Sequence, residues 1–354
     1  MIDHASSPDH ALARRTVLKG AGLGVGAGLA STLAAPAAAQ TTGAGGVGAA
    51  QPNDAPIWSA EYWTKKGDIP LYIFRKRLGA PKAGEAPRPV LFLVHGSSVT
   101  WRIFDLDTPG HGEYSMMNVF ARWGFDVWTM DHENYGKSGR TSGNSDIASG
   151  AQDLKAAMPV VAKETGRQKV HFMGESSGAL RAALYATTEP EHVDRLVLAA
   201  FTYKGTESPT LKKRAEQLEY FRTHNMRKRD RAMIEGIFTR DKPGSTDPAV
   251  GKILADVELQ YGDQAPTGTY LDMTANLPVV DPAKVQAPVL LVRGEYDGIA
   301  TVEDLFDFYR QLPHGDKQLV ILPNTAHSVA VAINRHLFWH AVRGFLDMPA
   351  VTAI

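Results

Sequence analysis

The sequence of 354 residues contains no cysteine. This absence excludes disulfide bonds, a cysteine nucleophile and a metal site built on thiolates. The chain also lacks an excess of charge of either sign, because 38 lysines and arginines offset 38 aspartates and glutamates. Its charge therefore predicts no nucleic-acid partner. The length suffices for one large domain with an insertion.

A G-x-S-x-G pentapeptide at residues 174–178 carries the strongest functional signal. The apolar-leaning residues 169–173 before it predict a buried strand, and residues 179–186 after it predict a helix. Strand, sharp turn and helix form the setting of a nucleophile elbow, in which a Cβ at either glycine would collide with a neighbouring element. Ser176 is then the candidate nucleophile, at a helix start that favours negative charge. The alternative is a glycine- and serine-rich turn without chemistry.

Two polar residues downstream also follow predicted strands. The apolar residues 288–293 predict a buried strand, and Asp297 lies in the loop after it. The next predicted strand leads into a loop that ends at His327 and precedes a predicted apolar helix at residues 329–333. A serine hydroxyl needs a base within hydrogen-bond reach, and an acid can orient that base. His327 is the candidate base and Asp297 the candidate acid, with Glu295 in the same loop as the alternative acid.

A loop upstream supplies candidate hydrogen-bond donors. Residues 89–94 form a nearly continuous apolar run that predicts a buried strand, and residues 95–98 follow it. In the setting of a nucleophile elbow, a backbone N–H from this loop and the one after the nucleophile can form an oxyanion hole. We therefore assign these donors to Ser97 and Ser177, with Ser98 as the alternative if the loop is offset by one residue.

Together these segments resemble the α/β-hydrolase superfamily. The matching segments are HGSS at 95–98, GESSG at 174–178, GEYDG at 294–298 and NTAH at 324–327. The order serine, aspartate, histidine along the chain is that of this fold. Residues 131–138 are similar to the family's D-x-x-G-x-G-x-S segment, except that Asn134 stands where glycine is common. The resemblance covers residues 57–347 and implies a mostly parallel central sheet flanked by helices.

The resemblance and the candidate residues predict a serine hydrolase without a cofactor or metal. His327 would take the proton of Ser176, Asp297 would hold the imidazole, and a small or medium carboxylic ester would be cleaved through an acyl-enzyme. The same residues can serve lactone, amide or C–C bond hydrolysis. A non-catalytic binding protein on this scaffold is the further alternative. Epoxide hydrolases of this fold are disfavoured, because their elbow carries aspartate.

A long connection at about residues 203–282 predicts a cap over the site. It contains two helix-like stretches, at 211–221 and 226–237, and lids of this kind exclude water and shape specificity. Several of its large side chains can line a pocket, although we expect most to be core. These are Tyr203, Tyr220, Phe221, Phe238, Tyr261, Tyr270 and Met273.

Basic residues gather in the same segment, at 212–214 and 227–231. They can attract an anionic substrate, but we favour a solvated helix face.

Other histidines are weighed against His327. His95 belongs to the loop at 95–98 and is interpreted as structural, and His171 lies in a predicted strand as a core residue. His336 and His340 are four residues apart on a predicted helix, a spacing that can bind metal. The sequence offers no third ligand near them, so we expect no metal site.

The N-terminus resembles a twin-arginine export signal. Arg14 and Arg15 precede a weakly apolar stretch at 20–35, which is too short and too weakly hydrophobic for a membrane anchor. Small residues end at Ala39, a predicted cleavage point. We therefore expect a signal peptide at 1–39, a flexible linker at 40–56 and a periplasmic or secreted protein that engages the twin-arginine export machinery. The lack of cysteine fits this route, since the resemblance implies export of folded protein from a reducing cytoplasm.

Overall fold

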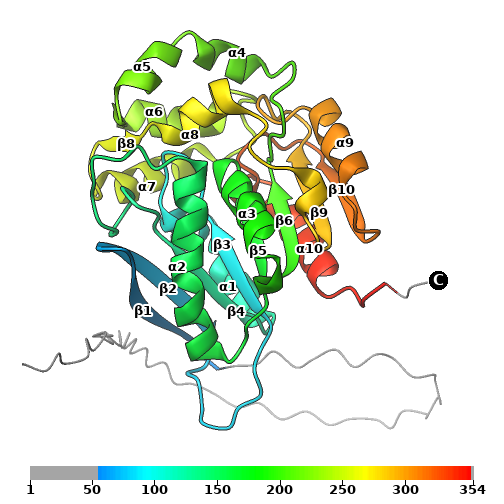
Figure 1. Ribbon diagram of the computed structural model, residues 1–354. Helices are drawn as coiled ribbons and strands as arrows, with labels where there is room; N and C mark the ends of the chain where they lie inside the picture. Colours follow the sequence, from blue (N-terminus) through cyan, green and yellow to red (C-terminus); the bar gives the residue numbers. More distant parts are fainter. Residues whose placement is uncertain (1–54, 352–354) are drawn as a thin grey trace, which may run out of the picture.

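The computed structural model describes residues 55–351, and in this part of the chain an eight-stranded sheet forms the centre of the molecule (Figure 1). The strand order is β1-β2-β4-β3-β5-β6-β9-β10. The strands are β1 (Ile57–Lys66), β2 (Ile69–Leu78), β3 (Val90–Val94), β4 (Asp126–Met130), β5 (Val170–Glu175), β6 (Val193–Ala199), β9 (Val289–Gly294) and β10 (Lys317–Leu322). The expected signal peptide and nearly all of the linker lie outside the described residues.

The sheet is parallel from β4 through β10, and β2 pairs antiparallel with both β1 and β4. Every residue of β3, β4 and β5 is buried, as expected for strands that are covered on both faces. The apolar runs in the sequence therefore located the parallel strands correctly. The β1–β2 hairpin was not predicted. The mostly parallel sheet with flanking helices confirms the expected α/β-hydrolase fold.

Helices cover both faces of this sheet. On one face pack α2 (Ile147–Thr165), α3 (Ser177–Thr188) and α9 (Val302–Gln311), and on the other pack α1 (Met116–Arg122) and α10 (Arg335–Leu346). Alternate strand residues feed the two cores. Phe92 and Phe172 face the first group of helices, whereas Leu91 and Leu93 face the second.

The connection between β6 and β9 lies above the carboxyl ends of the parallel strands (Figure 1). It contains α4 (Pro209–Ala215), α5 (Leu218–Thr223), α6 (Arg231–Thr239), α7 (Pro248–Leu259), α8 (Gly268–Leu271) and a small antiparallel ribbon of β7 (Met226–Lys228) and β8 (Gln264–Pro266). We call this segment the cap. Shorter helical turns occupy Trp101–Phe104, Pro190–His192, Asp272–Asn276, Pro282–Lys284 and Val329–Val331.

The two predicted cap helices differ from the observed ones. The stretch at 211–221 is divided into α4 and α5. The stretch at 226–237 begins as strand β7, because its backbone pairs with β8, and it becomes helical only at Arg231. The carboxylate of Asp230 accepts the N–H of Met233 at 2.9 Å and so fixes the start of α6. Within residues 55–351, no helix is both long and apolar enough to cross a membrane.

Candidate active site

Ser176 lies at the sharp turn between β5 and α3. Its backbone has φ 59° and ψ −125°, a conformation that costs energy for a residue with a side chain and that persists only when the surroundings impose it. The surroundings impose it through two close approaches. A Cβ on Gly174 would lie 2.3 Å from the carbonyl oxygen of Gly178, and one on Gly178 would lie 2.1 Å from that of Val94. The predicted requirement for both glycines is confirmed.

Three candidate residues form one continuous hydrogen-bonded chain. The Nε2 atom of His327 is 2.9 Å from Oγ of Ser176, and its Nδ1 is 2.8 Å from Oδ1 of Asp297. An ionised carboxylate only accepts hydrogen bonds, so Nδ1 carries the proton and Nε2 is free to accept one from the serine. The structure thus brings together Ser176, His327 and Asp297 from three separate strand ends.

The environment of Asp297 favours its charged form. Burial alone raises the pKa of this carboxyl, but His327 and the N–H groups of Ile299 and Ala300 outweigh burial and hold the pKa below its ordinary value. Glu295, the alternative acid, is exposed and accepts the N–H of Asn324 at 2.9 Å. The geometry therefore places Asp297, and not Glu295, against the imidazole.

The segment after His327 differs from the prediction. The expected helix at 329–333 is only a short turn over Val329–Val331, since Ala332 adopts an extended conformation that ends it, and α10 begins later at Arg335. The turn instead aims the N–H of Ala330 at the carboxyl of Glu175, 3.3 Å away. Burial raises the pKa of Glu175 to about 7, although this N–H and that of Val329 act in the opposite direction.

The loop at 95–98 lies directly against the elbow. A Cβ on Gly96 would come within 3.2 Å of the Cβ of Ser176. The side chain of Ser97 contacts Oγ of Ser177 at 2.8 Å and Oγ1 of Thr269 at 2.7 Å. The backbone N–H groups of Ser97 and Ser177 find no acceptor among residues 55–351, so both are available to a ligand.

Ser98, the alternative donor, has a different environment. Its backbone has a positive φ of 68°, and its hydroxyl bonds to that of Tyr270 in the cap. Ser97 lines the cavity beside Ser176, whereas Ser98 is buried behind it.

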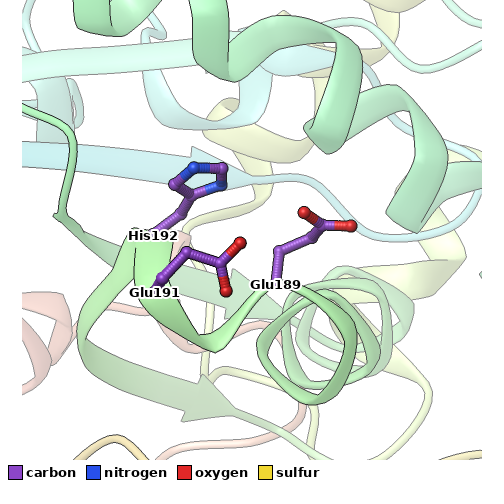
Figure 2. Close-up of side chains that lie close together, drawn as sticks. All are labelled: Glu189, Glu191 and His192. Atoms are coloured by element: carbon purple, nitrogen blue, oxygen red, sulfur yellow. The ribbon is translucent and has the colours of Figure 1, made fainter.

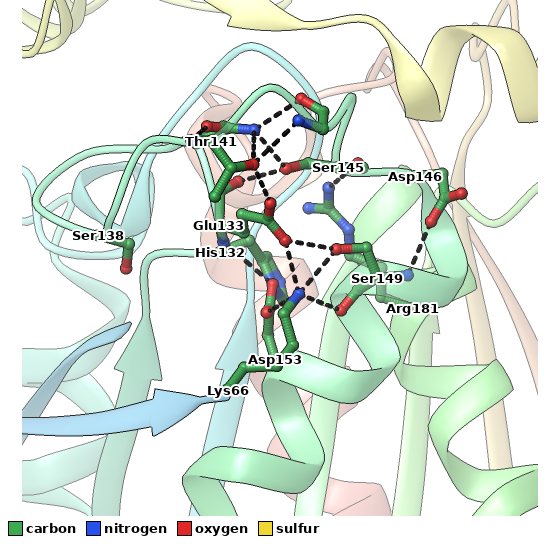
Figure 3. A network of polar contacts seen from close by, with 12 residues as sticks. Lys66, His132, Glu133, Ser138, Thr141, Ser145, Asp146, Ser149, Asp153 and Arg181 are labelled. Atoms are coloured by element: carbon green, nitrogen blue, oxygen red, sulfur yellow. Dashed lines mark hydrogen bonds and ion pairs between the residues drawn. The ribbon is translucent and has the colours of Figure 1, made fainter. Parts of the chain in front are cut away.

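His95 connects this loop to a polar network that includes His132, Asp153 and Lys66 (Figure 3). The ring of His95 donates to the carbonyl of Gly96 and accepts the N–H of His132, whose own ring bonds to Asp153 at 3.1 Å. Lys66 in β1 pairs with Asp153 at 2.6 Å. The structural role expected for His95 agrees with these contacts.

Asn134 belongs to the same network and explains the departure from the glycine pattern. Its φ is 66°, a left-handed conformation that asparagine tolerates better than most residues. Its side chain donates to the carbonyl of Gly143 at 2.8 Å and accepts the N–H of Thr141 at 2.7 Å. These bonds offset the backbone cost that glycine avoids.

A cavity of about 410 Å³ opens above Ser176 and His327. Its floor is the sheet edge, and its roof is the cap. Of the seven large cap side chains considered from the sequence, only Tyr270 lines it. The apolar lining comes instead from Val99, Ile103, Met233 and Ile237. Met233 and Ile237 are four residues apart on α6, and this spacing could have identified them from the sequence as neighbours on one helix face.

The basic residues of the cap divide into two groups. Lys212 and Arg231 lie at the surface in ion pairs with Glu207 and Asp256, as expected for a solvated face. That expectation is wrong for Arg214 and Arg227, which are partly buried and line the cavity, and for Arg229, which is buried against Glu258. Lys213 also lines the cavity, but it is exposed.

Other titratable groups lie away from the cavity. His336 and His340 are both on α10, where His340 packs on Trp123. Glu189, Glu191 and His192 offer ligand atoms within 4.8 Å of one another (Figure 2). This cluster follows the carboxyl end of α3, roughly 18 Å along that helix from Ser176, so it is no part of the candidate active site.

The sheet order, the elbow and the strand-end loops define an α/β-hydrolase. Residues 86–331, more than half of the chain, match the model of the family described as serine aminopeptidase, S33, and the chain belongs to that family.

Individual proteins are also similar to this chain. The AB hydrolase superfamily protein YisY of Bacillus subtilis (strain 168) is 26% identical over 262 residues, which span 68% of this chain and 85% of YisY. The fold is similar to that of E-2-(acetamidomethylene)succinate hydrolase, with a TM-score of 0.59 and 20% identity over 81% of this chain and 99% of the other. It is also similar to the carboxylesterase CesB (YbfK) of Bacillus subtilis, with a TM-score of 0.57 and 21% identity over 82% and 93% of the two chains.

Proposed function

We propose that the chain is a serine esterase that cleaves a small or medium carboxylic ester by way of an acyl-enzyme. The observation that carries this proposal is the continuous chain of hydrogen bonds from Asp297 through His327 to Ser176, which ends at the floor of a cavity. The N–H groups of Ser97 and Ser177, which find no acceptor in the described part of the chain, flank the same serine. The carboxylesterase CesB shares the fold.

Each step of the reaction has a residue for it. Nε2 of His327 accepts the proton as Oγ of Ser176 attacks the ester carbonyl, and the imidazolium then returns that proton to the leaving alkoxide. Asp297 keeps Nδ1 protonated and stabilises the imidazolium. The N–H groups of Ser97 and Ser177 donate to the oxyanion, and the loss of one such donor costs roughly 10²–10³ in kcat. Water activated by His327 then releases the acid from Ser176.

A p-nitrophenyl ester series of increasing acyl length tests this proposal. Parent protein should hydrolyse the series and react with a fluorophosphonate probe, and Ser176→Ala should do neither. Hydrolysis that persists in folded Ser176→Ala would contradict the assigned nucleophile. If the parent is labelled but leaves every ester intact, the same triad serves another acyl substrate, a lactone or an amide, or a C–C bond.

We also propose that the protein is exported by the twin-arginine route with cleavage near Ala39. Arg14 and Arg15 support this proposal, with the small residues that end at Ala39. In a bacterium with that pathway, the full chain should yield a shortened form outside the cytoplasm. Arg14→Lys with Arg15→Lys should keep it unprocessed inside. A parent chain that stays unprocessed in the cytoplasm would contradict export.

A further inference from the structure

The roof of the cavity is strongly basic. The basic lining residues come from separate parts of the cap and are Lys213, Arg214, Arg227 and Arg240. The acidic lining residue is Glu175 on the floor, whose carboxyl is already engaged by Ala330. Among the residues that the structure describes, Arg240 forms an ion pair, with Asp241 at 3.1 Å, whereas no carboxylate contacts Lys213, Arg214 or Arg227. The cavity therefore carries uncompensated positive charge.

Arg214 is the clearest example of this uncompensated positive charge. The residue is partly exposed, but its Nη1 is buried and has no hydrogen-bond partner among residues 55–351. Burial, together with the neighbouring Arg240 and Arg227, lowers the pKa of this guanidinium to about 10, although Tyr270 and Asp241 act in the opposite direction. Arg214 remains charged at neutral pH all the same. A buried and unpaired cation is costly, so its presence indicates a partner other than the residues that the structure describes.

Tyr270 places this charge close to the reacting atoms. The guanidinium carbons of Arg214 and Arg227 lie 4.9 and 4.7 Å from the centre of the Tyr270 ring. The hydroxyl of the same tyrosine bonds to Ser98, in the loop that supplies the proposed oxyanion donor. Two guanidinium groups on one ring repel each other unless an anion neutralises them. The side chain of Tyr270 thus lies between these two guanidinium groups and the loop at 95–98.

We propose that Arg214 and Arg227 form a subsite for a carboxylate or a phosphate group. The ester substrate carries this group at the end remote from its scissile carbonyl. This inference rests on the proposed esterase function. Guanidinium groups bind both anions through paired N–H donors. The apolar side chains of Met233 and Ile237 line the same cavity and suit the short carbon segment between the two ends. A volume of about 410 Å³ fits a small molecule.

Binding to the Ser176→Ala variant tests the subsite without turnover. The probes are 4-acetoxybenzoate, 4-acetoxyphenyl phosphate and the neutral methyl 4-acetoxybenzoate, measured by titration calorimetry. At least one anionic probe should bind roughly 10- to 100-fold more tightly than the neutral ester, and the stronger of the two identifies the anion. Equal binding of all three probes, or no binding of either anion, would overturn the subsite.

Matched variants locate the effect. In the Ser176→Ala background, Arg214→Met with Arg227→Met should abolish the preference for the anion, and Arg231→Met, at the cap surface, should retain it. A preference that survives the double substitution would overturn the assignment to these arginines. If the double variant does not fold, Arg227→Gln alone should still reduce the preference, because Arg227 is half-buried and forms no ion pair within residues 55–351.

Hydrolysis by the parent protein separates the two proposals. A higher kcat/KM for an anionic acetate than for its methyl ester supports both. Hydrolysis of neutral and anionic esters at equal rates would overturn the subsite and leave the esterase intact. Tight binding of an anion to a protein that neither hydrolyses an ester nor reacts with a fluorophosphonate would contradict the esterase and leave the subsite as an anion-binding site.

Discussion

The floor and the roof of the cavity hold their polar groups in opposite ways. On the floor, Ser176, His327 and Asp297 bond to one another, and the side chain of Ser97 bonds to two further hydroxyls. On the roof, Arg214 and Arg227 rest on an aromatic ring without an ion-pair partner among the described residues. Groups that are satisfied by the protein are preorganised for one reaction, whereas groups left unsatisfied await a ligand. The contrast separates the proposed chemistry from the proposed selection of substrate.

The largest expected effect is the loss of activity on substitution of Asp297, on the floor of the cavity. Asp297→Asn should lower kcat by about 10⁴-fold, because an amide in that position leaves His327 in the wrong tautomer to accept the serine proton. Glu295→Gln, in the same loop, should change kcat little, since that carboxylate contacts Asn324 and not the imidazole. Initial rates on one p-nitrophenyl ester measure both. Near-normal activity in Asp297→Asn would refute the assigned acid.

Arg229 is a basic residue of the cap that, like the groups on the floor, bonds to other residues of the protein. Its Nη1 donates to Glu258 and to the carbonyl of Ser98, both at 2.8 Å, and both charged side chains are almost fully buried. Arg229→Met should therefore lower the free energy of unfolding by about 3–5 kcal/mol, because the buried carboxyl of Glu258 loses its ion-pair partner. Urea denaturation measures the loss.

Arg231→Met is the matched control for that substitution. Its ion pair with Asp256 lies at the surface, so its removal should leave the unfolding curve nearly unchanged. Equal losses in the two variants would show that burial is not what distinguishes these neighbouring arginines.

The difference between floor and roof also explains what the sequence could reveal. Ser176 directly follows a predicted strand, and Asp297 and His327 lie in the loops after two others. Parallel strands end at one edge of a sheet, so the convergence of the three residues follows from the strand pattern. Arg214 and Arg227 lie in different elements of the cap and meet only because β7 pairs with β8 and Tyr270 lies between them. No local pattern encodes that meeting.

Smaller errors have the same origin in tertiary contacts. The residues at 226–228 resemble a helix start locally, and only their partner strand makes them extended. The apolar residues after His327 have the composition of a helix, but Ala332 is extended and the N–H of Ile333 donates to the carbonyl of Ser245 at 2.9 Å, so only one turn forms. In each case a long-range contact overrides the local preference.

Glu175 should make stability depend on pH. Its folded pKa of about 7 lies above the ordinary value, so the folded protein binds this proton more tightly than the unfolded chain does. Its contribution is fully present below about pH 4.5 and is lost as the pH rises to 7, by about 3 kcal/mol at about 1.4 kcal/mol per pKa unit. Relative to Glu175→Gln, the parent should therefore lose stability between pH 4.5 and 7.5. Urea denaturation at both pH values measures this, and a parallel dependence in both proteins would contradict it.

The smallest expected effect is a gain in stability on substitution of Arg214. Arg214 is charged at pH 7, and its lowered pKa shows that the folded protein holds that charge at a cost of about 3 kcal/mol. Its stacking on Tyr270 is lost on substitution, which offsets about 1 kcal/mol of the gain. Arg214→Met should therefore raise the free energy of unfolding of the ligand-free protein by about 1–2 kcal/mol, measured by urea denaturation beside Arg229→Met. A loss of the size expected for Arg229→Met would mean that Arg214 already has a structural partner, and the roof would then resemble the floor. The proposed subsite requires that Arg214→Met gains stability and loses anion binding. Arg214 would then be a residue that selects the substrate and destabilises the ligand-free protein.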